Sequence, residues 1–325
     1  MADAKTKYLD QSAIPVIDIA ELYSETNLAL RRVADDMRRA AESIGFFYVK
    51  NHGIPQAQIA RAFEIAHHFF ESPSEQKALV AVNAFHRGFL RIGEAKMYDG
   101  ARADLKESFV WGLELDASRR AELPPDTMIG RNVWPDFLPE MQSVLVSHLE
   151  SCNKVGWLLL RAFATALGIS HDYFVRTIDR PLSRGSLIYY PPQPPELGEQ
   201  QFGVAPHTDY GCLTLLCQDD AGGLQVRNAD GDWVTALPIA DTFVVNVGDL
   251  LARWTNDRFA STPHRVINRS GRERFSVAVF VDPNEETIIE PVVPQGEKSH
   301  YDPVTCAAYI RSRYDAAFSY RRAKT

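Results

Sequence analysis

The sequence predicts a mainly β fold with bracing helices and a double-stranded β-helix, or jelly-roll, core. From residue 186 onward the chain breaks into short β-rich runs separated by turns, which is typical of sandwiches and barrels. Candidate metal ligands lie on strand-like segments of this part, and ligands on inward faces fit a jelly roll that encloses a cavity. The predicted strands cover residues 186–190, 203–209, 213–217, 224–227, 233–236, 242–247, 261–268 and 275–281.

Helices are expected before the β-rich part. Apolar residues recur at spacings of three and four between residues 27 and 44, which predicts an amphipathic helix, and a strand follows at 45–49. A second helix is predicted around residues 59–70. Residues 72–75 have the spacing of a capping box, and Pro73 would occupy the first position of a third helix.

Two further helices complete the expected framework. One apolar stripe runs from Met141 to Ala166, and Gly168 stops it. His148 lies on this stripe and is expected to be a core histidine with satisfied hydrogen bonds. Residues 304–320 show a helical rhythm, and we expect them to fold back over the opening of the cavity.

Length, charge and cysteine usage are those of an ordinary globular chain. With 325 residues the protein can bury a large core. The formal net charge of −7 argues against a general nucleic-acid surface. No apolar run reaches about 18 residues, and the first ten residues lack a signal peptide, so we expect a cytoplasmic protein without membrane spans. The four cysteines show no paired zinc spacing and are expected to be reduced.

The segment APHTDY at residues 205–210 carries two candidate metal ligands. Residues two apart on an extended strand face the same way, so His207 and Asp209 project together. His264 opens another strand-like segment and offers a third ligand. Two histidines and one carboxylate form the facial triad of non-haem Fe(II) oxygenases, which leaves one face of the ion open. The short motif alone is more often a hydrogen-bonded surface pair.

An alternating strand at residues 274–280 places Arg274 and Ser276 on one face. A guanidinium beside a hydroxyl suits a carboxylate, because arginine presents a planar fork and keeps its charge. An acidic co-substrate next to the metal would use this pair. Arg272 shares the same parity, and a solvated arginine at a turn exit is the competing interpretation for both arginines.

Short motifs follow one another in order along nearly the whole chain. They are IPVID at 14–18, GFFYV at 45–49 followed by NHG, LIYYP at 187–191, GGLQV at 222–226 and NVGD at 246–249. Together with the APHTDY, HRV and RFS segments, they resemble the 2-oxoglutarate- and Fe(II)-dependent dioxygenases of the isopenicillin N synthase-like family.

The resemblance implies an enzyme that uses Fe(II), 2-oxoglutarate and O2. His207, Asp209 and His264 would hold Fe(II), and 2-oxoglutarate would chelate it through its 1-carboxylate and keto oxygen. The expected reaction hydroxylates or desaturates a small-molecule substrate and releases succinate and CO2. Neither nucleic acid nor a membrane is an expected partner, and the oligomeric state stays open.

The resemblance also assigns the co-substrate site. In the family, the positions of Tyr190, Arg274 and Ser276 hold the distal carboxylate of 2-oxoglutarate. Many plant members have Asn where this chain has Ile188, which removes one polar side chain from the family pattern. Outer hydrogen bonds to the metal ligands are expected, and the candidates for them are Asn246 and Trp254.

Substrate selection is expected from the segment between residues 85 and 109, which leans over the metal in the resembling family. The candidate substrate contacts are Phe85, Arg87, Arg91, Tyr210 and Phe280. Solvated loop arginines and a core role for Phe280 are the competing interpretations. The proline-rich loop at residues 191–203 is expected at the cavity mouth.

Four regions follow from these assignments. Residues 1–110 form an N-terminal helical and strand region that shapes the substrate site, and residues 111–184 contain the long bracing helix. Residues 185–290 form the double-stranded β-helix catalytic core, and residues 291–325 form the C-terminal helix.

Other functions stay open on the sequence. An isopenicillin N synthase-like oxidase would use no 2-oxoglutarate, and an ethylene-forming type of enzyme shares the His-Thr-Asp-Tyr run. A zinc hydrolase would also use two histidines, an aspartate and a water, although the chain has no HExxH pattern. A non-catalytic, cupin-like binding protein would keep the barrel alone.

Overall fold

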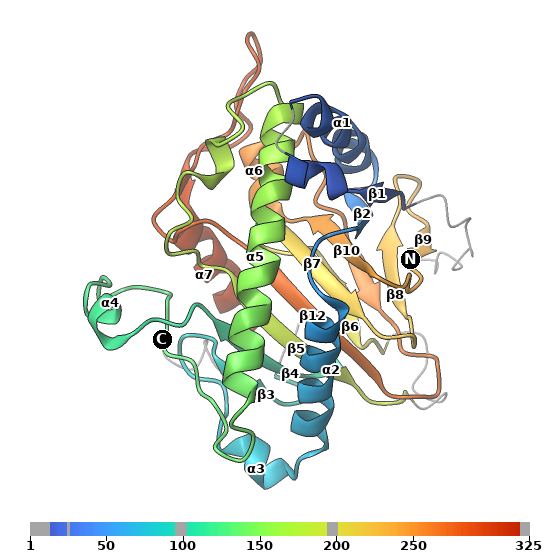
Figure 1. Ribbon diagram of the computed structural model, residues 1–325, viewed down its shortest axis with the longest axis vertical. Coiled ribbons are helices and arrows are strands. Elements are labelled where there is room, and N and C mark those ends of the chain that lie inside the picture. Colours follow the sequence, from blue (N-terminus) through green and yellow to red (C-terminus); the bar gives the residue numbers. More distant parts are fainter. Residues whose placement is uncertain (1–13, 25–26, 95–102, 194–200, 319–325) are drawn as a thin grey trace.

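A computed structural model describes residues 14–24, 27–94, 103–193 and 201–318. Its centre is an eight-stranded sheet of order β1-β2-β10-β7-β12-β5-β4-β3, accompanied by a four-stranded sheet of order β6-β11-β8-β9 (Figure 1). All neighbouring strands in the two sheets are antiparallel, except β1 and β2, which run parallel.

The larger sheet draws its strands from both halves of the chain. Its strands are β1 (Val16–Asp18), β2 (Phe46–Lys50), β3 (Gly88–Leu90), β4 (Glu107–Gly112), β5 (Arg184–Tyr190), β7 (Leu213–Gln218), β10 (Thr242–Val247) and β12 (Arg274–Val281). The smaller sheet contains β6 (Val204–His207), β8 (Leu224–Arg227), β9 (Trp233–Thr235) and β11 (His264–Val266). Every predicted β-rich run therefore contains a strand.

The two faces of the larger sheet bury different partners. Alternate residues such as Val49, Leu215 and Val279 point to the helices and join one apolar cluster. Their neighbours, such as Tyr48 and Ala278, point to the smaller sheet and join a second cluster. The predicted jelly-roll core is confirmed: a cavity-forming pair of β layers with helices outside.

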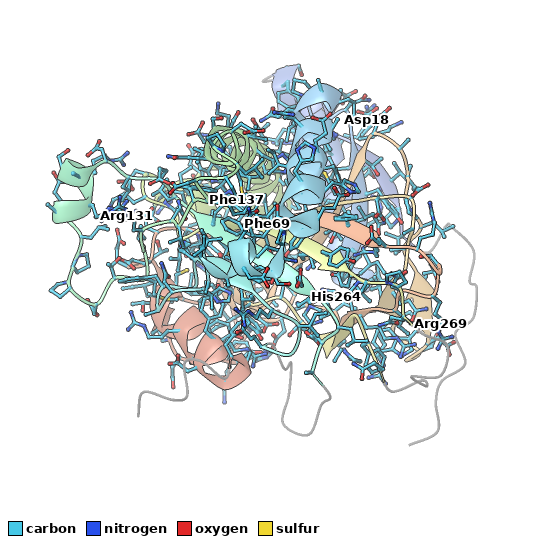
Figure 2. All side chains as sticks on the ribbon, turned by 90° about the horizontal axis from the view of Figure 1, so that it is seen from below. Asp18, Phe69, Arg131, Phe137, His264 and Arg269 are labelled. Atoms are coloured by element: carbon cyan, nitrogen blue, oxygen red, sulfur yellow. The ribbon has the colours of Figure 1, made fainter. Side chains whose placement is uncertain are left out.

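Three helices cover the outer face of the larger sheet: α1 (Asn27–Ser43), α2 (Gln56–Glu71) and α5 (Met141–Ala166). The long helix α5 runs across this face beside α2 (Figure 1). In Figure 2, Phe69 of α2 and Phe137 lie together inside the molecule, with ring centroids 6.3 Å apart, whereas Arg131 and Arg269 lie at its edges. These helices form where the sequence predicts them.

Short elements complete the chain. They are η2 (Ala20–Ser24), α3 (Ser74–Ala78), α4 (Ala117–Ala121), η3 (Tyr173–Val175), α6 (Asp249–Trp254), the pair β13 (Ile288–Ile289) and β14 (Val304–Thr305), and α7 (Cys306–Ala317). No helix in the described ranges is long and apolar enough to cross a membrane.

The prediction of a capping box at residues 72–75 is wrong. Helix α3 begins at Ser74, and Pro73 precedes it without a side-chain cap. The Ser72 hydroxyl instead donates a 2.7 Å hydrogen bond back to the carbonyl of His68 at the end of α2. The preceding helix therefore takes the hydroxyl that the capping box required.

Gly45 ends α1 in a conformation that favours glycine, with φ of 68°. A side-chain Cβ at this position would lie 2.1 Å from the carbonyl oxygen of Ala260 and 2.9 Å from the Thr262 hydroxyl. The end of α1 is therefore pressed against the segment that leads into β11.

His148 is fully buried on α5, as predicted, but only one of its nitrogens is engaged. Its Nε2 lies 3.5 Å from the Cys152 thiol, while Nδ1 has no hydrogen-bond partner within the described residues. Burial disfavours the charged imidazolium and lowers the pKa of His148 to about 4. The expectation of a fully satisfied histidine is therefore wrong for Nδ1.

The buried His148 gives the first prediction. The unfolded chain takes up a proton near pH 6.5, whereas the folded chain resists it down to about pH 4, so His148 costs stability as the pH falls through this window. Replacing His148 with Leu should reduce the loss of unfolding free energy between pH 6.5 and 4 by up to about 3 kcal/mol. Urea denaturation of both proteins across this range measures the difference, and parallel pH profiles would contradict it.

Candidate active site

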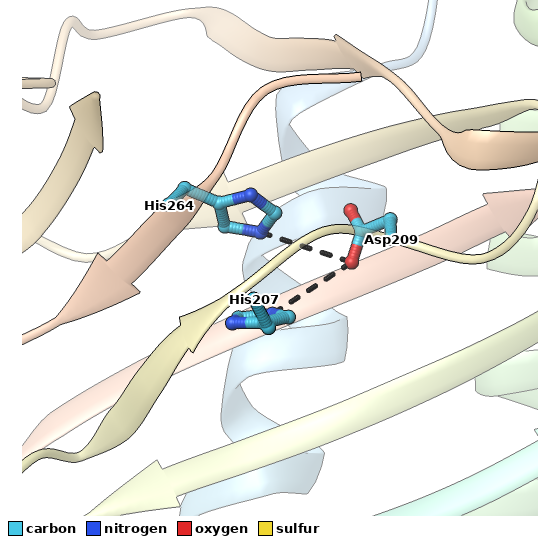
Figure 3. Close-up of side chains that lie close together, drawn as sticks. All are labelled: His207, Asp209 and His264. Atoms are coloured by element: carbon cyan, nitrogen blue, oxygen red, sulfur yellow. Dashed lines mark ion pairs between the residues drawn. The ribbon is translucent and has the colours of Figure 1, made fainter. Parts of the chain in front are cut away.

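Two strands of the smaller sheet bring the predicted histidines together. Strands β6 and β11 pair antiparallel with His207 directly opposite His264. Asp209 lies two residues beyond the end of β6, in the segment that connects it to β7. One ligand atom from each of the three residues lies within 4.8 Å of the others. Figure 3 shows Asp209 Oδ1 facing both imidazoles, 3.8 Å from His207 Nε2 and 3.7 Å from His264 Nε2.

Backbone carbonyls set the tautomer of both histidines. The Nδ1 atom of His207 lies 2.8 Å from the carbonyl oxygen of Ala205, and that of His264 lies 3.2 Å from the carbonyl oxygen of Thr262. A carbonyl only accepts, so each Nδ1 carries the hydrogen and donates it. Both Nε2 atoms therefore present lone pairs toward Asp209 Oδ1, as a metal site requires.

The second oxygen of Asp209 is fixed by neighbouring strands. The Thr214 hydroxyl donates to Oδ2 at 2.6 Å, and the Asn246 amide donates at 2.8 Å. Asn246 thus lies where an outer partner was predicted. Trp254 does not, because its ring packs against Tyr173 and Phe174.

The electrostatics keep the cluster ready for a cation. Burial lowers the pKa of His207 well below its usual value. For Asp209, burial acts to raise the pKa, but attraction to His264 and His207 in their charged forms and the hydrogen bonds from Thr214 and Asn246 outweigh it and hold the pKa below its usual value. Neutral imidazole and ionised carboxylate form the donor set that suits a divalent transition metal.

A cavity of about 100 Å³ opens beside this cluster. Its lining residues come from β3, β4, β5, the β6–β7 connection, β12 and the C-terminal end of α7. They are His86, Leu90, Lys106, Ser108, Val110, Arg184, Ser186, Ile188, His207, Thr208, Asp209, Tyr210, Phe280, Tyr314 and Phe318. The C-terminal segment thus lies at the cavity, as predicted, while residues 194–200 of the proline-rich loop fall outside the described ranges.

Arg274 lies in a buried polar cluster. Cross-strand pairing sets it beside Tyr190, with its guanidinium carbon 4.6 Å from the tyrosine ring centroid. Its nitrogens donate to the Gly222 carbonyl at 2.5 Å, the Ser276 hydroxyl at 3.3 Å and the Gln218 amide oxygen at 3.3 Å. The predicted trio of tyrosine, arginine and serine is therefore assembled on one inner face.

Among the described residues no carboxylate forms a direct ion pair with Arg274, although the charge of Arg274 acts on the nearby Asp219. The guanidinium has 0% exposure, and the nearby Asp219 directs its oxygens to the backbone N–H groups of Phe275 and Ala221. A buried unpaired cation is costly, so the cluster fits an anionic ligand. By contrast, Arg272 is exposed and pairs with Asp220. The interpretation as a solvated arginine, considered for both residues, therefore fits Arg272 and not Arg274.

Comparisons with known proteins agree with this geometry. Residues 14–137 match the family described as non-haem dioxygenase in morphine synthesis N-terminal, and residues 186–283 match the 2OG-Fe(II) oxygenase superfamily. A 2-oxoglutarate-Fe(II) type oxidoreductase from Emericella nidulans, hxnY, is 32% identical over 94% of this chain and 91% of its own length. This chain belongs to the 2-oxoglutarate–Fe(II) oxygenase superfamily.

Other relatives also match the oxygenase over most of both chains. A homoarginine-6-hydroxylase of Glycine max is 34% identical over 87% of this chain and 89% of its own length. The crystal structure of a full-length Neurospora crassa protein in complex with α-ketoglutarate and thymine superposes with a TM-score of 0.84 at 29% identity, covering 96% of this chain and 99% of that one. The recognised family and its cofactors are confirmed: the oxygenase uses Fe(II), 2-oxoglutarate and O2.

Three predicted substrate residues of the oxygenase do not line the cavity. Side chains alternate around β3, so His86 and Leu90 face the cavity. Phe85, Arg87 and Arg91 have the opposite parity. The cavity is therefore lined by the other face of this segment, and a substrate contact by these three residues stays a prediction.

Each of the three has a different environment. Phe85 lies against Gly130 and is 42% exposed. Arg87 is buried, and its Nη1 donates to the carbonyls of Phe85 and His86. Arg91 is exposed and borders a separate surface hollow. The other two predicted contacts, Tyr210 and Phe280, do line the cavity of the oxygenase.

Sequence reasoning missed the charged residues of the cavity wall. Arg184 and Ser186 share the inward face of β5 with Ile188 and Tyr190, so counting back in twos from Tyr190 would have found them. Arg184 donates at 2.9 Å to the buried carboxylate of Asp282. Lys106 and Ser108 required the pairing of β4 with β5, which the sequence does not display.

The fixed carboxylate of Asp209 gives the second prediction. Replacing Thr214 with Val keeps the shape but removes one of two donors to Oδ2, so Asp209 turns more freely. Dissociation of Fe(II) from the oxygenase should become about tenfold easier, in line with typical effects of outer partners. Anaerobic metal titration measures it, with Thr235→Val on β9 as the matched control. An unchanged dissociation constant would contradict the role given to Thr214.

Proposed function

We propose that His207, Asp209 and His264 hold the Fe(II) of this oxygenase. The observation that carries the proposal is the convergence of two Nε2 atoms and one carboxylate oxygen at the edge of a cavity. Both imidazoles are held in the tautomer that binds metal through Nε2. Three ligands on one side leave the cavity side of the ion for co-substrate and O2.

The distal carboxylate of 2-oxoglutarate belongs, in this proposal, with Tyr190, Arg274 and Ser276. Arg274 supplies a buried positive charge that forms no ion pair with a described carboxylate, and Ser276 adds a hydroxyl beside it. A planar guanidinium with a neighbouring hydroxyl recognises a carboxylate through directed hydrogen bonds. The chain then fixes the co-substrate at the end remote from the metal.

The oxygenase hydroxylates or desaturates a small molecule and converts 2-oxoglutarate to succinate and CO2. Fe(II), when bound, supplies the oxidising chemistry with O2. The protein orients the reactants: Asp209 is locked by Thr214 and Asn246, and Phe46 packs edge-on against the His264 ring at 5.2 Å. These contacts fix the orientations of the Asp209 carboxylate and the His264 ring.

We propose a flat, uncharged or anionic small molecule as the substrate. Four aromatic rings line the cavity, those of Tyr210, Phe280, Tyr314 and Phe318. Arg184 lies among them, and its charge is neutralised by Asp282, so it suits a hydrogen-bond acceptor. Among the described lining residues Asp209 is the only carboxylate, which disfavours a cationic substrate. The thymine complex of the Neurospora relative supports a ring-shaped substrate.

We also propose membership of the isopenicillin N synthase-like branch and a cytoplasmic location. The ordered motifs along the chain support the branch. All four cysteines are free and buried, which suits a reducing compartment.

Loss of a metal ligand gives the third prediction. Wild-type protein with Fe(II) and 2-oxoglutarate under anaerobic conditions should show a weak visible charge-transfer band, and should release succinate once O2 is admitted. His207→Ala and Asp209→Ala should lose both signals, because two protein ligands cannot hold the ion in this geometry. His171→Ala, an exposed histidine, is the control. Retention of the band in either site variant would remove that residue from the metal site.

Loss of the buried cation gives the fourth prediction. Arg274→Met should raise the 2-oxoglutarate concentration required for half-maximal succinate release by about 100-fold, because a buried charge pair contributes a few kcal/mol. Iron affinity should stay within about twofold, since Arg274 touches no metal ligand. The exposed neighbour Arg272→Met serves as control. An equal requirement in both variants would place the distal carboxylate elsewhere.

A further inference from the structure

The NVGD motif ends in Asp249, a residue that belongs neither to the triad nor to the cavity lining. Asp249 is the first residue of α6, and its side chain is 14% exposed. Its backbone N–H donates at 2.7 Å to the carbonyl of Asp209. Its carboxylate accepts the hydroxyls of Ser261 and Tyr309. Asp249 therefore contacts three parts of the chain that are distant in sequence.

The backbone at the start of α6 holds the metal-ligand loop, residues 209–212. The first N–H groups of a helix have no acceptor within the helix. The N–H of Gly248 donates to the Cys212 carbonyl at 2.9 Å, and that of Leu250 donates to a carbonyl of the same loop at 3.0 Å. A Cβ at Gly248 would lie 2.3 Å from the Gly211 carbonyl oxygen, so the two segments are in close contact. The loop and the start of α6 are therefore held as one unit.

The carboxylate of Asp249 connects the segment of His264 to the C-terminal helix α7. Its Oδ1 accepts the hydroxyl of Ser261, three residues before His264, at 2.7 Å. Its Oδ2 accepts the Tyr309 hydroxyl of α7 at 3.1 Å and lies 3.6 Å from Nη2 of Arg313. One carboxylate thus holds the segment of a second proposed metal ligand and docks a helix.

The docked part of α7 forms a wall of the cavity. The guanidinium carbon of Arg313 lies 4.8 Å from the ring centroid of Tyr210, which directly follows Asp209. Tyr314, the next residue of α7, lines the cavity, and its ring centroid lies 6.2 Å from that of Tyr210. The metal-ligand loop and α7 are therefore joined twice, through Asp249 and through the ring of Tyr210.

We propose that Asp249 is a positioning residue that couples the metal ligands to the docking of α7. The inference rests on the proposed metal site. Asp209 and His264 lose mobility when they bind Fe(II), and Asp249 holds the segments of both, so α7 docks more firmly on the metal-loaded protein. Coupling between two sites is reciprocal, so docked α7 strengthens Fe(II) binding by the same factor. The substrate-facing wall is thereby tied to the state of the metal site.

Hydrogen exchange of the full-length protein, with and without Fe(II) under anaerobic conditions, measures this coupling. Residues 306–317 of α7 report docking, and residues 56–71 of α2 report the overall stabilisation that any bound ligand gives. In the wild type, Fe(II) should slow amide exchange in α7 about fivefold more than in α2, the lower end of typical coupling between sites. An anaerobic titration gives the Fe(II) dissociation constant of each protein.

Variants at the docking contact should remove the coupling. Tyr309→Phe combined with Arg313→Met removes the α7 side of the contact and leaves Asp249 and its backbone bonds in place. The extra protection of α7 should disappear, and the Fe(II) dissociation constant should rise about fivefold. Asp249→Asn should give the same result, because an amide carries no charge for Arg313 and has only one acceptor oxygen for Ser261 and Tyr309.

Two further variants separate docking from folding. Arg311→Met is the matched control on α7, because Arg311 donates to the carbonyl of Asp126 and not to Asp249. It should keep both the extra protection and the Fe(II) affinity. Tyr309→Phe alone removes a single hydroxyl, keeps the ring, and should lose part of the coupling.

Protection of α7 that is equal in the wild type and the double variant overturns the inference, as does wild-type protection of α7 no greater than that of α2. Loss of the coupling in Arg311→Met as well would assign the effect to the general packing of α7, and also overturns it. Failure of the wild-type protein to bind Fe(II) would instead contradict the proposed metal site.

Discussion

The antiparallel pairing of β6 with β11 is the constraint on which the site depends. It places His207 opposite His264, although 57 residues separate them in the chain. A slip of one residue would turn one imidazole to the other face of the sheet and open the cluster. The larger sheet fixes the third member, because Thr214 on β7 and Asn246 on β10 pair with each other and both hold Asp209. The proposed metal site thus lies where the two sheets meet.

The register of the larger sheet also links the cavity lining to the residues that support the cluster. One row of paired residues crosses the larger sheet. It begins with Arg184 and Phe280 in the cavity lining, continues through Thr214 and Asn246, and ends at Phe46, whose ring packs against His264. Asp282 ties the row to the metal loop, because one oxygen accepts Arg184 and the other accepts the backbone N–H of Cys212. Substrate wall and metal ligands are therefore positioned by shared hydrogen bonds.

Local periodicity was sufficient to predict much of this arrangement. Alternation placed Arg274 with Ser276 and His207 with Asp209, and the β-rich runs gave every strand from β5 to β12. Alternation was not applied to the segment before β3, where His86 and Leu90 line the cavity and Phe85 and Arg87 do not. It also missed Lys106, Ser108 and Thr214. Their roles come from strand neighbours distant in sequence, which one strand's pattern does not contain.

The contact between Gly45 and Ala260 bears on how such an enzyme can be redesigned. The carbonyl of Ala41 accepts the N–H of Ala260, and Glu42 pairs with Arg258. The C-terminal end of α1 therefore supports the segment that leads to His264. The N-terminal region also supplies four strands of the central sheet. An engineer who trimmed the chain to its jelly roll, or replaced its N-terminal region with one that lacks these contacts, would leave the segment before His264, the proposed third iron ligand, without its support.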